Sequence, residues 1–257
     1  MLRRAFAPLG ILLATTALGV APALAQAVVV RASGPSAAKF PTGKKLADGA
    51  KVSLEAGDTV TVLDRAGTRV LKGKASFTID NKVVRDRGVV GMLSRTLNNP
   101  TSIRAGAVRG VVLPGVAAPP MLPKSVWIAD IDRGGKVCVP QGSDLYLWRG
   151  SNTTRRTTSL GAAEGGTMVT LLFPPRTSGV AWPSATLPLI AGRSYRMNDD
   201  GASDRAVEFE IVSLAPDAIP DNAADLGSLL LSHGCAVQFE MLAESLEKLG
   251  EEAEAAL

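Results

Sequence analysis

Short stretches in which apolar and polar residues alternate dominate residues 27–80. Over residues 59–63, Val60 and Val62 fall on one side of the chain, and residues 64–67 then supply a turn into a matching stretch over 68–71. A period of two, β-branched residues and turns rich in Gly and Asp are typical of antiparallel strands. We therefore predict an antiparallel β-module with strands over residues 28–30, 51–54, 59–63, 68–71 and 76–79.

The pattern changes character after residue 81. Apolar residues between 82 and 98 recur at helical spacing, and Asn98-Asn99-Pro100 ends the run, so we predict a short helix there. Residues 104–112 suit one further strand. The proline-rich run over 114–123 is typical of a linker. These features place a first module at residues 26–113.

Residues 124–219 return to short strands separated by turns. The clearest covers residues 206–212, where Val207, Phe209 and Ile211 face inward and Glu208 and Glu210 face water. Several short strands at this spacing favour a β-sandwich over a barrel. The fold class we predict is mainly β, with two sandwich-like or barrel-like modules. The module begins at residues 126–128, and the other expected strands cover residues 137–139, 145–148, 157–160, 167–173, 180–182 and 194–197.

A strong helical pattern covers residues 220–250, ahead of an acidic tail at 251–257. Asp221 is the expected N-cap, and an apolar stripe includes Leu226, Leu230 and Met241. Gly234 interrupts the pattern. It either lets a continuous helix approach the strand that carries Cys138 or divides the segment into two helices.

Residues 1–25 have the pattern of a secretory signal peptide. Arg3 and Arg4 precede an uncharged apolar run, and Ala23-Leu24-Ala25 supplies the small residues of a cleavage site. The run is shorter than the roughly 20 residues of a spanning helix. We expect cleavage after Ala25 and a periplasmic or secreted protein that does not span the membrane.

Charge is unevenly distributed along the rest of the chain. Residues 26–123 hold 15 Lys and Arg against 6 Asp and Glu, whereas residues 124–257 hold 11 against 18. A basic module can attract an acidic protein or an anionic cell-wall polymer, or its charge can simply solvate the surface. We expect no nucleic-acid partner, and the sequence leaves the oligomeric state open. The candidate binding residues are Lys44, Lys45, Lys51, Arg65, Arg69, Lys72 and Lys74.

Cys138 and Cys235 are the only two cysteines. In an exported protein such a pair most often forms one structural disulfide, which here would close a loop of 98 residues. A redox pair is the alternative, but neither cysteine lies in a C-x-x-C motif.

Residues 56–71 read Ala-Gly-Asp-Thr-Val-Thr-Val-Leu-Asp-Arg-Ala-Gly-Thr-Arg-Val-Leu. This hairpin resembles the repeats of FecR-like periplasmic modules. Most of the chain after residue 25 is similar to a group of uncharacterised exported proteins of alphaproteobacteria, which share segments like 137–139 and 147–149 and a Cys-bearing C-terminal helix. The resemblance to FecR-like proteins implies an envelope signalling or scaffold role. The chain lacks the transmembrane segment of a signalling FecR, which argues against relay across a membrane.

Candidates for chemistry are few. His233 is the only histidine, so no site can contain several histidines, and we predict neither a metal nor a cofactor. Asp130 and Asp132 are the candidate carboxylate pair, in a segment that faintly resembles a calcium loop but is typical of a turn. Three tryptophans can act as core anchors or as a carbohydrate-stacking platform, namely Trp127, Trp148 and Trp182.

These observations favour a non-enzymatic envelope protein. It would act as a scaffold or as a binding module for a cell-envelope protein or polymer. The alternative is a carboxylate-dependent hydrolase of an envelope polymer, with Asp130 and Asp132 as its only candidate pair.

Overall fold

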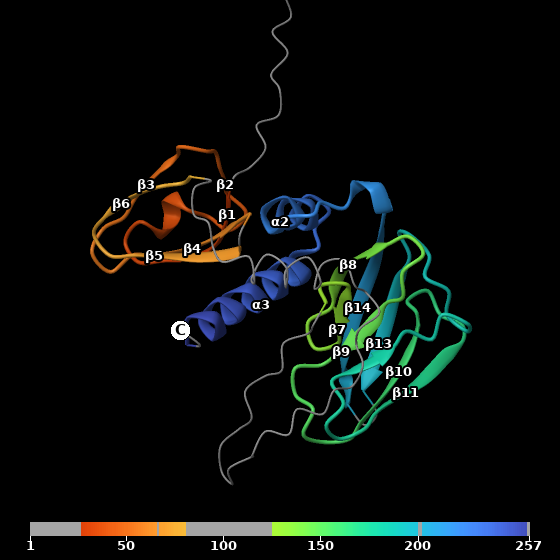
Figure 1. The fold of residues 1–257 in the computed structure, drawn as a ribbon. Helices are drawn as coiled ribbons and strands as arrows, with labels where there is room; N and C mark the ends of the chain where they lie inside the picture. Colours follow the sequence, from red (N-terminus) through yellow and green to blue (C-terminus); the bar gives the residue numbers. More distant parts are fainter. Residues whose placement is uncertain (1–26, 66, 81–124, 200–201, 256–257) are drawn as a thin grey trace, which may run out of the picture.

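The computed structural model describes residues 27–65, 67–80, 125–199 and 202–255 (Figure 1). The expected signal peptide, the helix over 82–98, the strand over 104–112 and the linker over 114–123 lie outside these residues. In the described part the chain is mainly β with helices at its C-terminal end, as predicted. Its elements are β1 (Ala27–Ser33), η1 (Ala37–Lys39), β2 (Lys45–Leu46), β3 (Lys51–Ser53), β4 (Thr59–Asp64), β5 (Gly67–Lys72), β6 (Ser76–Thr78), β7 (Ile128–Asp130), β8 (Gly135–Pro140), β9 (Tyr146–Trp148), β10 (Arg156–Ala162), β11 (Met168–Phe173), β12 (Gly179–Ala181), β13 (Ser194–Asp199), β14 (Ala202–Leu214), η2 (Pro216–Ala218), α2 (Ala223–Ser232) and α3 (Ala236–Ala255).

The N-terminal module is an antiparallel sheet in the order β2-β1-β4-β5, accompanied by the two-stranded ribbon β3-β6. Alternate residues of its strands point to opposite faces. Val29, Val60 and Val62 belong to a core that also includes Val52 of the ribbon. Val28, Val30 and Leu63 instead belong to a second core, which they share with the helices. Both faces of the sheet are therefore covered, which explains why β4 is buried on both sides.

The second module contains a five-stranded sheet in the order β11-β10-β13-β14-β8 and a three-stranded sheet in the order β12-β9-β7. Residues of both sheets form one core, in which Leu147 of β9 and Phe209 of β14 are fully buried. Two of the pairings are parallel, β14 with β8 and β7 with β9. The inward and outward residues of β14 follow the predicted alternation, but the strand extends beyond the predicted 206–212.

The C-terminal segment forms two helices instead of one. Gly234 lies between them with a φ of 77°, a left-handed conformation that glycine adopts without steric cost. His233 is the C-cap of α2. The prediction of Asp221 as the N-cap was wrong by one residue, because the Asn222 side chain accepts the hydrogen bond from the Asp225 N–H at 3.0 Å.

The helices lie between the two β-modules, as Figure 1 shows. A single core joins Leu63 of the N-terminal sheet, Leu230 of α2, Phe239 of α3 and Trp127 of the second module. Gly227 permits the close approach of α2, since an added Cβ there would lie 2.8 Å from the Leu63 side chain. The predicted C-terminal helix is thus the shared support of both modules.

Candidate interaction surface

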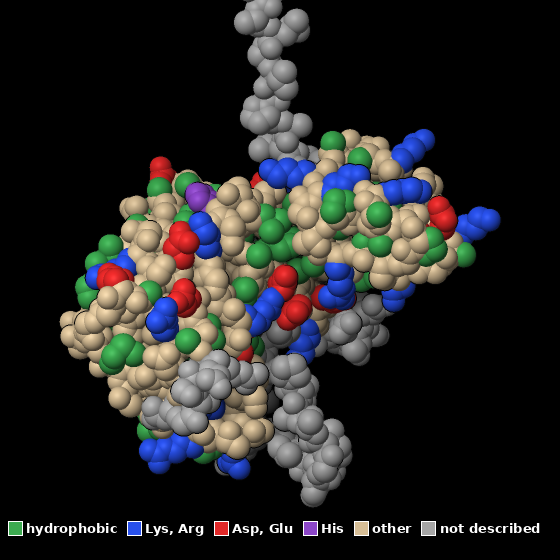
Figure 2. Space-filling view, turned by 180° about the vertical axis from the view of Figure 1, so that it is seen from behind, with side chains coloured by type: hydrophobic (Ala, Val, Ile, Leu, Met, Phe, Trp, Pro, Cys, Tyr) green, Lys and Arg blue, Asp and Glu red, His purple; other side chains and the backbone are tan. Residues whose placement is uncertain are grey.

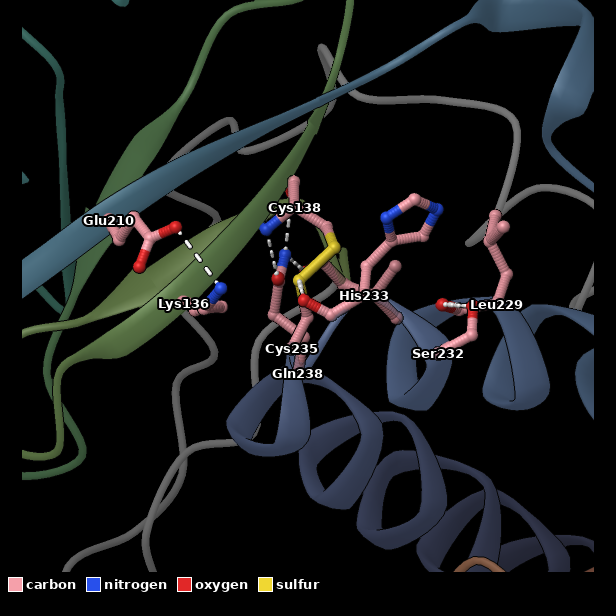
Figure 3. The surroundings of a disulfide bond; sticks show 9 residues. Lys136, Cys138, Glu210, Leu229, Ser232, His233, Cys235 and Gln238 are labelled. Atoms are coloured by element: carbon pink, nitrogen blue, oxygen red, sulfur yellow. Dashed lines mark hydrogen bonds and ion pairs between the residues drawn. A yellow bond between two sulfur atoms is a disulfide. The ribbon is translucent and has the colours of Figure 1, made fainter. Parts of the chain in front are cut away.

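Cys138 of β8 and Cys235, directly before α3, form a disulfide with their Cα atoms 5.9 Å apart (Figure 3). The pairing agrees with the prediction. Both residues are fully buried in the core shared by the modules and the helices. Burial leaves the bond without the solvent access that redox exchange requires, so the geometry favours a structural role.

Gln238 of α3 lies beside the disulfide and is 1% exposed. Its Oε1 accepts from the Cys138 N–H at 2.6 Å, and its Nε2 donates to the carbonyls of Cys138 at 2.9 Å and Val126 at 2.8 Å. Sequence reasoning missed this residue. The available signal was a glutamine within an otherwise apolar helical stripe, where a buried amide needs partners.

His233 does not form a catalytic pair with Cys235. The cysteine is committed to the disulfide, and Figure 3 shows the imidazole ring pointing away from the two sulfur atoms. His233 instead caps the C-terminal end of α2.

Asp130 and Asp132 are engaged in structural interactions at the turn between β7 and β8. The Asp130 carboxylate accepts the Asp132 N–H at 2.8 Å, and desolvation raises the pKa of Asp130. Asp132 accepts from Arg156 at 2.5 Å, while the Arg156 guanidinium also donates to both oxygens of Asp199, at 2.8 and 2.9 Å. The segment is therefore a turn, as its sequence indicated, supported by an ion-pair network. The arrangement does not present two carboxylates free to face one substrate.

The tryptophans do not form a surface platform. Trp127 and Trp182 are 2% and 4% exposed, so neither can stack on a sugar. The Trp182 indole donates to the Leu187 carbonyl at 2.7 Å and packs edge-on against Tyr195. They anchor cores, and Trp148 is half-buried on β9.

The structure separates the seven candidate basic residues into two groups. Arg65 lies 4.0 Å from Asp225 of α2, and Arg69 lies 3.8 Å from Asp64 with its side chain only 17% exposed. Arg31, which was not among the candidates, donates to both oxygens of Glu247 on α3 at 2.6 and 2.7 Å. Part of the basic charge is therefore directed at acidic groups of the same chain, and Arg65 and Arg69 do not belong to a free basic surface.

The five lysines of the candidate set are all exposed. Lys44 donates to the Lys39 carbonyl at 2.7 Å and lies over the Phe40 ring. Within the described ranges no ion pair involves the other four, which lie on β2, on β3, at the end of β5 and in the turn after it. Figure 2 shows Lys and Arg side chains projecting from the N-terminal module into solvent. The four residues, here called the free lysines, are Lys45, Lys51, Lys72 and Lys74.

The charge of this surface is mixed. Residues 27–80 contain nine Lys and Arg but also five Asp and Glu. Exposed Glu55 and Asp80 lie on the same module, and Glu55 pairs with Lys39 at 3.5 Å. Much of the positive charge counted for residues 26–123 is carried by residues 81–123, outside the described part.

Among the described residues, no helix is long and apolar enough to cross a lipid bilayer. Comparison with models of protein families and with curated proteins finds no match to this chain.

Proposed function

We propose that this protein is a non-enzymatic module of the cell envelope that binds an anionic envelope polymer or an acidic envelope protein. The observation that carries the proposal is the set of free lysines, which project from a module packed against two helices. Long basic side chains that form no ion pair with the described residues are available to anionic groups. The resemblance of residues 56–71 to FecR-like modules, which are envelope signalling or scaffold components, supports a role in the envelope.

The compartment is part of the proposal. A disulfide persists in oxidising surroundings such as the periplasm or the outside of the cell, and Cys138–Cys235 supports export. The signal-peptide pattern of residues 1–25, with cleavage after Ala25, points to the same place.

A carboxylate-dependent hydrolase is the less favoured alternative. Its candidate residues are Asp130 and Asp132, and both carboxylates have structural partners in the turn and in the network around Arg156. A hydrolase of this kind needs two carboxylates placed on either side of the scissile bond. The observed contacts favour a structural use of the pair.

The test is retention of the purified chain on peptidoglycan sacculi and on anionic lipid vesicles, at low and high salt. Binding through exposed charges weakens with salt because ions screen them beyond roughly 8–10 Å. We expect salt-sensitive retention of the wild-type chain on sacculi. The double variants Lys72→Gln/Lys74→Gln and Lys45→Gln/Lys51→Gln should each reduce it.

The matched control is Arg155→Gln/Arg176→Gln, which removes two exposed charges from the second module. It should leave retention unchanged. Equal losses in the control and the lysine variants would show a response to net charge alone. Absence of retention on sacculi would contradict polymer binding. Retention on vesicles alone would indicate that the lysines bind a lipid surface instead.

A further inference from the structure

β11 is an open sheet edge. It is the outermost strand of the five-stranded sheet and pairs with β10 in an unbroken register from Arg156–Phe173 to Gly161–Met168. Within the described ranges no strand pairs with its other side. None of its six residues is charged, and Met168 and Leu172 are 46% and 43% exposed. Long, regular, uncharged edges readily pair with another strand.

The other end strands of the four- and five-stranded sheets, namely β2, β5 and β8, are protected. β2 has only two residues, one of them the exposed Lys45. The outer strand β5 carries two basic residues, Arg69 and the exposed Lys72. On β8, the Gln238 side chain occupies both backbone groups of Cys138. Short strands, lysines and covering helices are the usual defences of sheet edges, and within the described residues β11 has none of them.

The side chains of β11 are also compatible with antiparallel pairing between the β11 strands of two copies of the chain. Met168, Thr170 and Leu172 are exposed and alternate with Val169, Leu171 and Phe173, which point toward the core. A two-fold axis through Thr170 places Met168 of one copy opposite Leu172 of the other, and Thr170 opposite Thr170. Apolar pairs and Thr–Thr pairs stabilise antiparallel strands, and this register brings no like charges together.

The neighbouring residues are compatible with this contact. The Met168 sulfur lies over Gly161 of β10, and the absence of a Cβ at this glycine leaves room for the methionine side chain. Pro174 and Pro175 follow directly and end the strand. The edge available for pairing is therefore limited to the six residues of β11.

We propose that two copies of this chain associate through antiparallel pairing of their β11 strands, which joins two five-stranded sheets into one continuous sheet. The contact lies on the second module and is independent of the free lysines. A partner of this kind is recognised by backbone hydrogen bonds and by the apolar side chains beside them.

Sedimentation velocity of the full chain over a wide concentration series tests the proposal. We expect a reversible dimer for the wild type and monomers for both Thr170→Lys and Thr170→Glu, because each puts two like charges face to face across the axis. An equimolar mixture of these two variants should form a dimer again, since Lys then faces Glu. The control Thr153→Lys adds the same charge at an exposed position outside β11 and should still dimerise.

Rescue by mixing shows that each variant chain is folded, so misfolding cannot imitate the expected result. A wild-type chain that stays monomeric at every concentration overturns the proposal. A Thr170→Lys chain that still dimerises, or a mixture that does not associate, overturns the pairing through β11 about Thr170.

Discussion

The side chain of Gln238 binds the backbone of Cys138 in the way a neighbouring strand would. Its amide accepts the Cys138 N–H at 2.6 Å and donates to the Cys138 carbonyl at 2.9 Å. One residue of α3 therefore satisfies the free side of β8 next to the disulfide that joins the same two elements (Figure 3). The covalent bond and the hydrogen bonds fix one contact between the helices and the second module.

Gln238→Ala should destabilise the protein by about 2–3 kcal/mol, because it leaves buried backbone groups of Cys138 and Val126 without partners. Urea unfolding under oxidising conditions measures the loss. Gln141→Ala, at an exposed position, is the control and should change stability little. An equal effect of the two substitutions would contradict the role of the Gln238 amide.

Replacement of both cysteines by serine should lower the thermal midpoint by several degrees. A disulfide between residues 97 positions apart restricts the unfolded chain by about 4–5 kcal/mol in the loop-entropy model. Thermal unfolding of the oxidised wild type and of Cys138→Ser/Cys235→Ser gives the difference. Non-reducing peptide mapping of the exported protein should recover the linked pair, and two free thiols would refute it.

Gly227→Ala should destabilise the protein although alanine favours helices. The added methyl group would lie 2.8 Å from Leu63 and 3.1 Å from Phe239, in the core shared by α2, α3 and the N-terminal sheet. Overpacking of this kind costs about 1–3 kcal/mol. The neighbouring Ser228→Ala is the control, because the Ser228 hydroxyl is buried without a hydrogen bond and its removal should be neutral or stabilising. The free energies of unfolding of the two variants, measured in denaturant, should change in opposite directions or by clearly different amounts.

Leu226→Ala should lower the free energy of unfolding by about 2–5 kcal/mol, since Leu226 is fully buried in the shared core. Arg31→Gln breaks the exposed pair with Glu247 and should cost less than about 1 kcal/mol. Urea unfolding of both variants tests whether apolar packing, rather than the ion pairs, holds the N-terminal module on the helices. A larger loss of unfolding free energy in Arg31→Gln than in Leu226→Ala would contradict the dominance of apolar packing.

Asp58 should make the N-terminal module sensitive to acid. Its carboxylate accepts the N–H groups of Ser36 at 2.9 Å and Glu55 at 2.6 Å, and the bond from Ser36 contributes most to lowering its pKa. A lowered folded-state pKa gives stability that is present above the ordinary aspartate value of about 4 and is lost as the pH falls through the folded value.

Stability measured against pH should therefore decline below about pH 4 in the wild type. The part of the decline due to this carboxylate should be missing in Asp58→Asn, which is less stable at neutral pH. Asp48→Asn, at an exposed position of the same module, should keep the wild-type profile. An unchanged profile in Asp58→Asn would show that these hydrogen bonds do not couple to folding.

The local pattern of the sequence determined the strands and the class of the fold. Alternation with a period of two is a property of neighbouring residues, so Val207, Phe209 and Ile211 could be assigned to the inner face of β14 without knowledge of the sheet. The disulfide could be predicted because the chain offers only one pair of cysteines. The interruption at Gly234 was visible, but two outcomes fitted it until its left-handed conformation was known.

Tertiary structure alone decided where the helices lie and which basic residues remain free. The contacts of Arg31 with Glu247 and of Thr68 with Ala243 join residues far apart in the chain, and no local periodicity encodes such pairings. The open edge of β11 has the same origin, since an edge exists only once the order of strands is set. Local sequence determines which side chains a strand presents to each face, whereas long-range packing determines which of those faces and edges meet water.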